Sequence, residues 1–114
     1  MSRRYDVPSE YRAMWLFAMF DLPVKTNAER RAYTRFRTAL LCEGFCQLQY
    51  SVYGRYCGSD EFCQAVKQRV RALVPEKGQV RLLAVTERQF GRMEVLHGRK
   101  RRKAEEPPEQ LLLF

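Results

Sequence analysis

MWLFAMFDLP (residues 14–23) is the stretch of sequence that decides the fold. Its unbroken apolar run, rich in aromatic residues, predicts a strand that is buried on both faces. Asp21 ends the apolar run, and Pro23 stops the strand because proline has no N–H to donate to a sheet ladder. A carboxylate at the end of a buried strand is costly to desolvate, so Asp21 is expected to have a partner or a role.

Size and composition favour one folded domain with an anionic partner. The chain has 114 residues, 46% of them hydrophobic, and a formal net charge of +8. This length fits one domain, and the excess of cations favours nucleic acid as the partner. No stretch is long and apolar enough to cross a membrane and no signal-peptide pattern is present, so a soluble cytoplasmic protein is expected. The cysteines are then expected to be reduced thiols, with spacings that do not suit zinc: Cys42, Cys46, Cys57 and Cys63.

Local signals after the first strand predict a helix and then two short strands. Thr26 and Glu29 fit a capping box at the start of the helix, and Gly44 fits the position just past its end. Over residues 45–57, aromatic and β-branched residues alternate with polar ones, as in strands. This run is long for one strand, so we expect a tight bend near residues 49–51.

The second half of the domain repeats this pattern with a helix and a strand. Ser59 is expected to cap the helix, Pro75 ends it, and residues 80–85 form the strand. A further short strand is expected at Met93–Leu96, within residues 89–96. The order strand, helix, two strands, helix, strand predicts an α+β, ferredoxin-like βαββαβ fold.

Alternation along the first strand predicts a second copy of the chain. One set of side chains faces the two helices, which cover a single face of the sheet, and the other set faces away. The two sets are Trp15, Phe17 and Met19 on one side, and Leu16, Ala18 and Phe20 on the other; alternation alone does not say which of them faces the helices. Because an apolar patch of this kind does not stay exposed to water, we expect a homodimer stacked sheet to sheet.

Composition divides the chain into an arm, a domain and a tail. Residues 1–12 form a polar N-terminal arm, residues 13–97 the domain, and residues 98–114 a tail. The tail begins with a basic run, continues with an acidic, proline-containing linker and ends in an apolar pentapeptide. The basic run is Arg99, Lys100, Arg101, Arg102 and Lys103. We interpret this run either as a phosphate-binding arm or as a solubilising hinge.

Asp21 is the candidate for catalysis and for metal binding. With the Asp21 of a second copy it could ligate Mg²⁺, an ion that takes oxygen ligands and keeps several waters. The alternative is structural, with Asp21 capping a loop or pairing with an arginine of the first helix. One carboxylate per chain makes a weak metal site, so both interpretations stay open.

Arginines of the first helix are the candidates for binding nucleic acid. They mostly lie off the apolar stripe of that helix and greatly outnumber its acids: Arg30, Arg31, Arg35 and Arg37. Such a surface either contacts phosphates or is simply solvated. Tyr50, Ser51 and Tyr53 follow in the predicted bend and strand. Ser51 is read either as a group that positions a phosphate or water, or as part of the turn and core.

Four short motifs succeed one another along the chain. They are MWLFAMFDLP at 14–23 with the arginine-rich helix after it, Gly44-Phe45, QYSVY at 49–53 and VTERQ at 85–89. In this order and spacing they resemble the CRISPR-associated protein two family, the small partner of the integrase in spacer acquisition. The match is strongest to the short versions that accompany single-effector (type II) systems.

The resemblance implies a ferredoxin-like homodimer in which the last short strand, within residues 89–96, crosses to the partner's sheet. It implies a scaffold that bridges two dimers of the CRISPR integrase and grips a double-stranded DNA prespacer. The family's strand-end aspartate corresponds to Asp21, and its members are described as Mg²⁺-dependent endonucleases acting on DNA or RNA. A binding scaffold is favoured here, and an endonuclease with paired Asp21 residues is the alternative.

The apolar end of the tail is expected to dock on a partner or on its own domain. It consists of Gln110, Leu111, Leu112, Leu113 and Phe114. As a docking segment it could add a strand to the integrase. It also resembles the pentapeptide by which bacterial proteins bind the replication sliding clamp.

Overall fold

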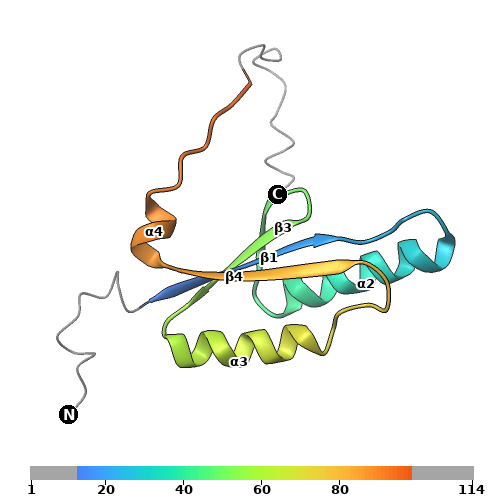
Figure 1. Cartoon of the computed structure of the whole chain (residues 1–114), viewed down its shortest axis with the longest axis horizontal. Coiled ribbons are helices and arrows are strands. Elements are labelled where there is room, and N and C mark those ends of the chain that lie inside the picture. The colour runs from blue at the N-terminus through green and yellow to red at the C-terminus, as the bar shows by residue number, and fades with distance from the viewer. Residues whose placement is uncertain (1–12, 99–114) are drawn as a thin grey trace.

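The computed structural model describes residues 13–98 (Figure 1). The predicted arm at residues 1–12 and the tail from residue 99 onward therefore lie outside the described residues. The elements, in chain order, are β1 (Met14–Asp21), α2 (Asn27–Cys42), β2 (Cys46–Gln49), β3 (Val52–Cys57), α3 (Asp60–Arg71), β4 (Gln79–Thr86) and α4 (Glu87–Gly91).

The four strands form one sheet with β1 in its interior. The strand order is β2-β3-β1-β4, and every neighbouring pair is antiparallel. β1 hydrogen-bonds to β3 along one edge and to β4 along the other, which confirms the strand predicted at residues 14–20. Burial on both faces is not found in the single chain, where Trp15, Phe17 and Met19 are only partly buried. Up to β4, the order of elements is the predicted βαββαβ arrangement.

Both long helices pack on the same face of the sheet and build the core with it (Figure 1). α2 contributes buried Phe36 and Leu40, and α3 contributes Cys63, Val66 and Val70. From β1 they meet Leu16, Ala18 and Phe20, which are all buried, so the structure shows which of the two alternating sets faces the helices. A core of this kind supplies the main driving force for folding, since apolar area is removed from water.

The predicted helix starts and the predicted bend are confirmed. Thr26 caps α2 in a capping box with Glu29, and the Ser59 hydroxyl accepts the Phe62 N–H at 3.1 Å to cap α3. The bend between β2 and β3 falls at residues 50–51, where Ser51 has a φ of 62°. The left-handed region is costly for a residue with a Cβ, so the serine at this turn is under backbone strain.

The face of the sheet away from α2 and α3, called here the open face, is mostly apolar. By the pairing register it carries Trp15, Phe17 and Met19 of β1, Val52, Gly54 and Tyr56 of β3, and Leu83 and Val85 of β4. The same register also places the cation Arg81 of β4 on this face, opposite Met19. Leu83 is 49% exposed and Tyr56 is 46% exposed. A Cβ at Gly54 would meet Leu48 at 3.0 Å and Phe17 at 3.4 Å, so glycine lets these side chains close over the strand.

The short strand predicted within residues 89–96 is not found in the single chain. Residues 87–91 instead form α4, because Thr86 and Gln89 make a second capping box. The Phe90 ring of α4 stacks on Trp15, with ring centroids 3.9 Å apart, and so covers one end of the open face. Residues 93–98 have no regular secondary structure, and their exchange with a second copy stays a prediction.

None of the helices among residues 13–98 is long and apolar enough to span a membrane.

Candidate nucleic-acid interface

Asp21 lies at the carboxyl end of β1 and is exposed. It pairs in register with Gln79 of β4, and strand alternation places its side chain on the open face, opposite to its neighbour Phe20. Within residues 13–98, Asp21 forms no ion pair or hydrogen bond through its side chain. The predicted pairing of Asp21 with an arginine of the first helix is therefore not made by these residues.

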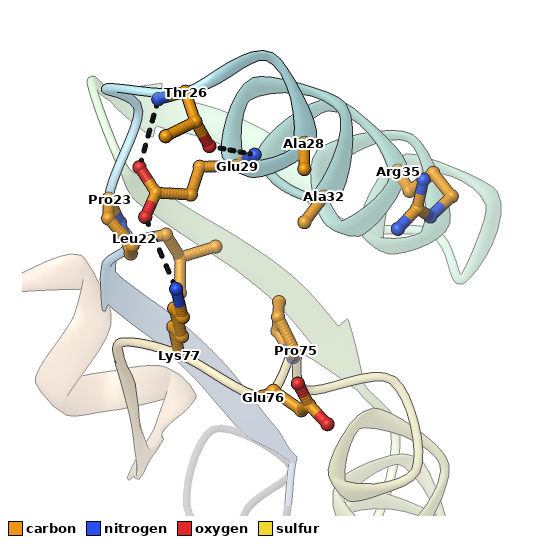
Figure 2. Close-up of a pocket in the computed structure, with 10 residues that line it drawn as sticks. All are labelled: Leu22, Pro23, Thr26, Ala28, Glu29, Ala32, Arg35, Pro75, Glu76 and Lys77. Atoms are coloured by element: carbon orange, nitrogen blue, oxygen red, sulfur yellow. Dashed lines mark hydrogen bonds and ion pairs between the residues drawn. The ribbon is translucent and has the colours of Figure 1, made fainter.

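A pocket of about 400 Å³ lies beside the residues that follow Asp21 (Figure 2). Leu22 and Pro23 form one wall, the first turns of α2 another, and Pro75 to Lys77 a third. The Glu29 carboxylate accepts the N–H groups of Lys25 and Thr26 at 2.9 and 3.1 Å and lies 3.7 Å from the Lys77 ammonium. These bonds fix the start of α2 against the loop that enters β4.

The arginines predicted to bind nucleic acid lie together on α2 but have different surroundings. Arg30, Arg31 and Arg35 line a shallow groove with Asn27 and Thr34. Within the described part of the chain, Arg31 and Arg35 are exposed and form no ion pair. They are the cations of this groove that are best placed to contact a phosphate, because neither must give up a carboxylate first.

Several other arginines hold the fold together. Arg30 donates to the backbone carbonyls of Val24 and Lys25 at 2.9 and 3.0 Å, which anchors the loop before α2. Arg55 donates to the carbonyl of Glu43 at 2.7 Å, and Arg69 pairs with the Glu43 carboxylate at 2.8 Å. Both guanidinium groups also lie over the Phe62 ring. The sequence contained no signal for this network, which ties the end of α2 to α3 and β3.

Arg37 does not line this groove and belongs instead to a group of side chains that we call the turn cluster. The cluster consists of Tyr33 and Arg37 of α2, Tyr50 and Ser51 of the β2–β3 turn, and Tyr53 of β3. The Tyr33 and Ser51 hydroxyls are 3.1 Å apart, and the Tyr33 and Tyr50 rings stack with centroids 6.3 Å apart. Burial raises the pKa of Tyr53, and the nearby Arg37 guanidinium opposes that shift. The two interpretations of Ser51 thus stay open after the structure is known: it shapes a turn, and its hydroxyl faces polar groups.

The described cysteines and carboxylates do not gather into a metal site. Among residues 13–98, no three His, Cys, Asp or Glu side chains lie close enough together to hold an ion. Cys57 and Cys63 are buried, while Cys42 and Cys46 are exposed. Burial, followed by the neighbouring Cys57 thiol, raises the pKa of Cys63 to about 11, so this thiol stays protonated and unreactive at neutral pH.

The remaining predicted site residues fall outside the described residues. These are the basic run (Arg99, Lys100, Arg101, Arg102 and Lys103) and the apolar pentapeptide (Gln110, Leu111, Leu112, Leu113 and Phe114).

An antiparallel βαββαβ sheet with both long helices on one face defines the ferredoxin-like class of α+β proteins. Within that class, the chain belongs to the CRISPR-associated protein Cas2 family, whose sequence model, described as "CRISPR associated protein Cas2", matches residues 14–93. The family resemblance read from the motifs is thereby confirmed.

Relatives and a solved structure agree with this assignment. The chain is 50% identical over 101 residues to a protein of Parvibaculum lavamentivorans, covering 89% of this chain and all of that one. It is 39% identical over 110 residues to a protein of Flavobacterium psychrophilum, covering 96% of each. Both are named "CRISPR-associated endoribonuclease Cas2". The crystal structure of Streptococcus pyogenes Cas2 has the same fold, with a TM-score of 0.54 at 19% identity, covering 73% of this chain and 99% of that one.

The bonds of Glu29 predict a pH-dependent contribution to stability. The N–H of Thr26, with Lys25 and Lys77, holds the pKa of Glu29 below its ordinary 4.5, against a smaller opposing effect of burial. A carboxylate with a lowered pKa in the folded state stabilises the protein above pH 4.5, and this contribution is lost as the pH falls through the folded-state value. We therefore expect Glu29→Gln to be less stable than the wild type at pH 7, with the difference shrinking below pH 4.5.

Urea unfolding followed by circular dichroism between pH 3 and pH 7 measures this difference. Glu76→Gln is the matched control, because Glu76 is exposed on the rim of the same pocket and should show no such dependence. A Glu29→Gln deficit of equal size at pH 3 and pH 7 would contradict the assignment.

Proposed function

We propose that this chain is a homodimeric nucleic-acid-binding scaffold of the CRISPR adaptation complex, which bridges integrase dimers and grips double-stranded prespacer DNA. The observation that carries the proposal is the separation of two surfaces. The apolar open face lies on one side of the sheet, and the arginine groove of α2 lies in the helical layer on the other side. A second copy can therefore cover the first surface without covering the arginines of α2.

The open face supports the homodimer part of the proposal. Its side chains come from all of the longer strands, and Leu83 and Tyr56 stay about half exposed in the single chain. A contiguous apolar patch on a sheet favours association, and the commonest arrangement of two copies is a twofold one that uses the same patch twice. Val95 and Leu96, also exposed, follow α4, and as part of the proposal they contact the second copy.

Leu83→Lys is expected to separate the two copies. Leu83 is exposed on the open face, so lysine is tolerated in the single chain but brings a charge into an apolar interface, where its desolvation is costly. Sedimentation velocity at micromolar concentration should show a dimer for the wild type and a monomer for Leu83→Lys. Val74→Lys is the control, because Val74 is similarly exposed but lies in the loop after α3. A wild type that is monomeric at these concentrations would refute the dimer.

The arginine groove supports the nucleic-acid part of the proposal. Arg31 and Arg35 lie one helical turn apart on an exposed surface, so both can approach one phosphate backbone. Contacts of this kind carry no sequence information and weaken as salt rises, because counterions are released on binding. The basic run of the tail is part of the same proposal as an added set of phosphate contacts. The apolar pentapeptide is proposed to dock on a partner protein, either the integrase or the sliding clamp.

Arg31→Gln and Arg35→Gln are expected to weaken binding to duplex DNA independently of its sequence. Each lost phosphate contact should lower the slope of log K against log salt by about one. Fluorescence anisotropy with two duplexes of unrelated sequence, at several salt concentrations, measures both effects. Arg71→Gln removes the same charge from the end of α3 and is the control. If all three variants lose the same affinity, general charge rather than the groove explains the binding.

A metal-dependent endonuclease is the second candidate, and the names of the relatives favour it. Asp21 projects on the open face, so a second copy seated there could bring a second Asp21 toward the first. Two carboxylates with several waters match what Mg²⁺ accepts. Bound there, Mg²⁺ would activate a water for attack on a phosphodiester. Since one chain supplies a single strand-end carboxylate, this site requires the dimer.

Asp21→Asn separates the two candidates. It keeps the shape of the side chain and removes the charge that a metal needs. For a scaffold, we expect Asp21→Asn to bind duplex DNA and to support prespacer integration by the integrase as the wild type does. An assay of RNA and DNA cleavage with Mg²⁺, made on the same preparations, tests the alternative. Integration that is lost in Asp21→Asn, while dimerisation and DNA binding persist, would show that this carboxylate takes part in the chemistry.

A further inference from the structure

The turn cluster gathers hydrogen-bond donors around a single positive charge. Its members come from α2, the β2–β3 turn and β3, and none of the five side chains is a carboxylate. The Tyr33 and Ser51 hydroxyls lie 3.1 Å apart, and hydrogen bonding to the Tyr33 hydroxyl is the main cause of a raised pKa at Tyr50. The hydrogen bond between the Tyr33 and Ser51 hydroxyls uses one of their two O–H groups, so the other O–H is left to donate to a further group.

Two groups in the cluster lack an acceptor. The Tyr53 hydroxyl is fully buried and has no hydrogen-bond partner among the described residues. Buried hydroxyls are normally paired, so an unpaired one points to a missing group. Beside it, the half-buried Arg37 guanidinium makes no ion pair within residues 13–98, although it carries five N–H donors. An anion with several oxygens is the group that would accept from the Arg37 guanidinium, whereas the Tyr53 hydroxyl is closed to solvent and is not counted among its donors.

The conformation of Ser51 supports a role for its hydroxyl. At a φ of 62°, glycine or asparagine would be the ordinary choice for the turn. Ser51 also accepts the N–H of Phe20 at 3.1 Å through its carbonyl, which fixes the turn to the end of β1. Its hydroxyl is thereby held toward Tyr33 and the rest of the cluster, while the exposed Tyr50 ring, 74% accessible, marks where the cluster opens to solvent.

We propose that the turn cluster binds a backbone phosphate of nucleic acid, with Arg37 supplying the charge and the Tyr33, Tyr50 and Ser51 hydroxyls supplying neutral hydrogen bonds. The inference rests on the proposed nucleic-acid-binding function and assigns it a site separate from the Asp21 carboxylate. Asp21 projects on the open face, whereas Phe20, its neighbour in β1, contacts Tyr33 and Tyr53 on the helix face. The Asp21 carboxylate therefore does not share the helix face with this phosphate.

Ser51→Gly is the deciding variant. Glycine adopts the left-handed conformation freely, so the turn should form at least as well as in the wild type, and only the hydroxyl is lost. If Ser51 serves the turn alone, duplex DNA affinity is unchanged. If its hydroxyl binds phosphate, affinity falls by about 2- to 10-fold, the effect of one neutral hydrogen bond, with no change in salt slope.

Two more variants and a control complete the test. Tyr33→Phe should lower the affinity by a similar salt-independent factor, and Arg37→Gln should also lower the salt slope by about one. Thr38→Val removes a hydroxyl from an exposed position of α2 outside the turn cluster and should bind as the wild type does. Anisotropy titrations with duplex DNA over a range of salt, with thermal unfolding of each variant, provide both readouts.

The outcomes distinguish this inference from the proposed function beneath it. A wild type that does not bind duplex DNA refutes the proposed function. A wild type that binds, together with unchanged affinity in Ser51→Gly and Tyr33→Phe, refutes the phosphate site alone. Inorganic phosphate at matched ionic strength is the second probe: if it competes with duplex at micromolar concentration, the cluster is a site for a free anion, and the backbone-phosphate inference is wrong.

Discussion

The whole structure depends on the burial of β1 in the middle of the sheet. Its two edges are hydrogen-bonded to β3 and β4, so its backbone is satisfied, and its side chains alternate between two layers. Leu16, Ala18 and Phe20 meet α2 and α3 and form the core of the single chain. Among residues 13–98, the Phe90 ring of α4 covers the other set at one end. One strand thus divides the molecule into a side that forms the core of the single chain and a side that stays partly exposed.

This division also explains how the cations are used. A net charge of +8 predicts an anionic partner but says nothing about which cations are available. In the structure, Arg30 anchors the loop before α2, and Arg55 and Arg69 hold the end of the same helix. Arg31 and Arg35 make no such hydrogen bonds or ion pairs among the described residues. Counting charges therefore overstates the binding surface, and only the geometry separates structural arginines from those that face solvent.

The sequence predicts the parts of the fold that depend on nearby residues. The caps at Thr26 and Ser59 are local, and the bend at residues 50–51 follows from a strand pattern too long for one strand. The sequence does not predict α4, although Thr86 and Gln89 fit its capping box, because the pattern Met93-Glu94-Val95-Leu96 favours a strand instead. The surroundings of Arg30 and Arg37 could not be predicted, since they depend on which loop or strand folds back against α2.

The last two residues of β1 direct an aromatic ring and a carboxylate to opposite faces of the sheet. Phe20 and Asp21 are adjacent in sequence, yet alternation sends the ring to the helix face and the carboxylate to the open face. The backbone N–H of Phe20 holds the carbonyl of Ser51, so the strained turn and its hydroxyls are fixed to the same point of the strand. A duplex bound on the helix side would approach the cationic groups, while Asp21 stays with the surface proposed for the second copy. That placement keeps a negative charge away from bound phosphates, which a scaffold requires. A nuclease would instead need the scissile phosphate to reach the open face.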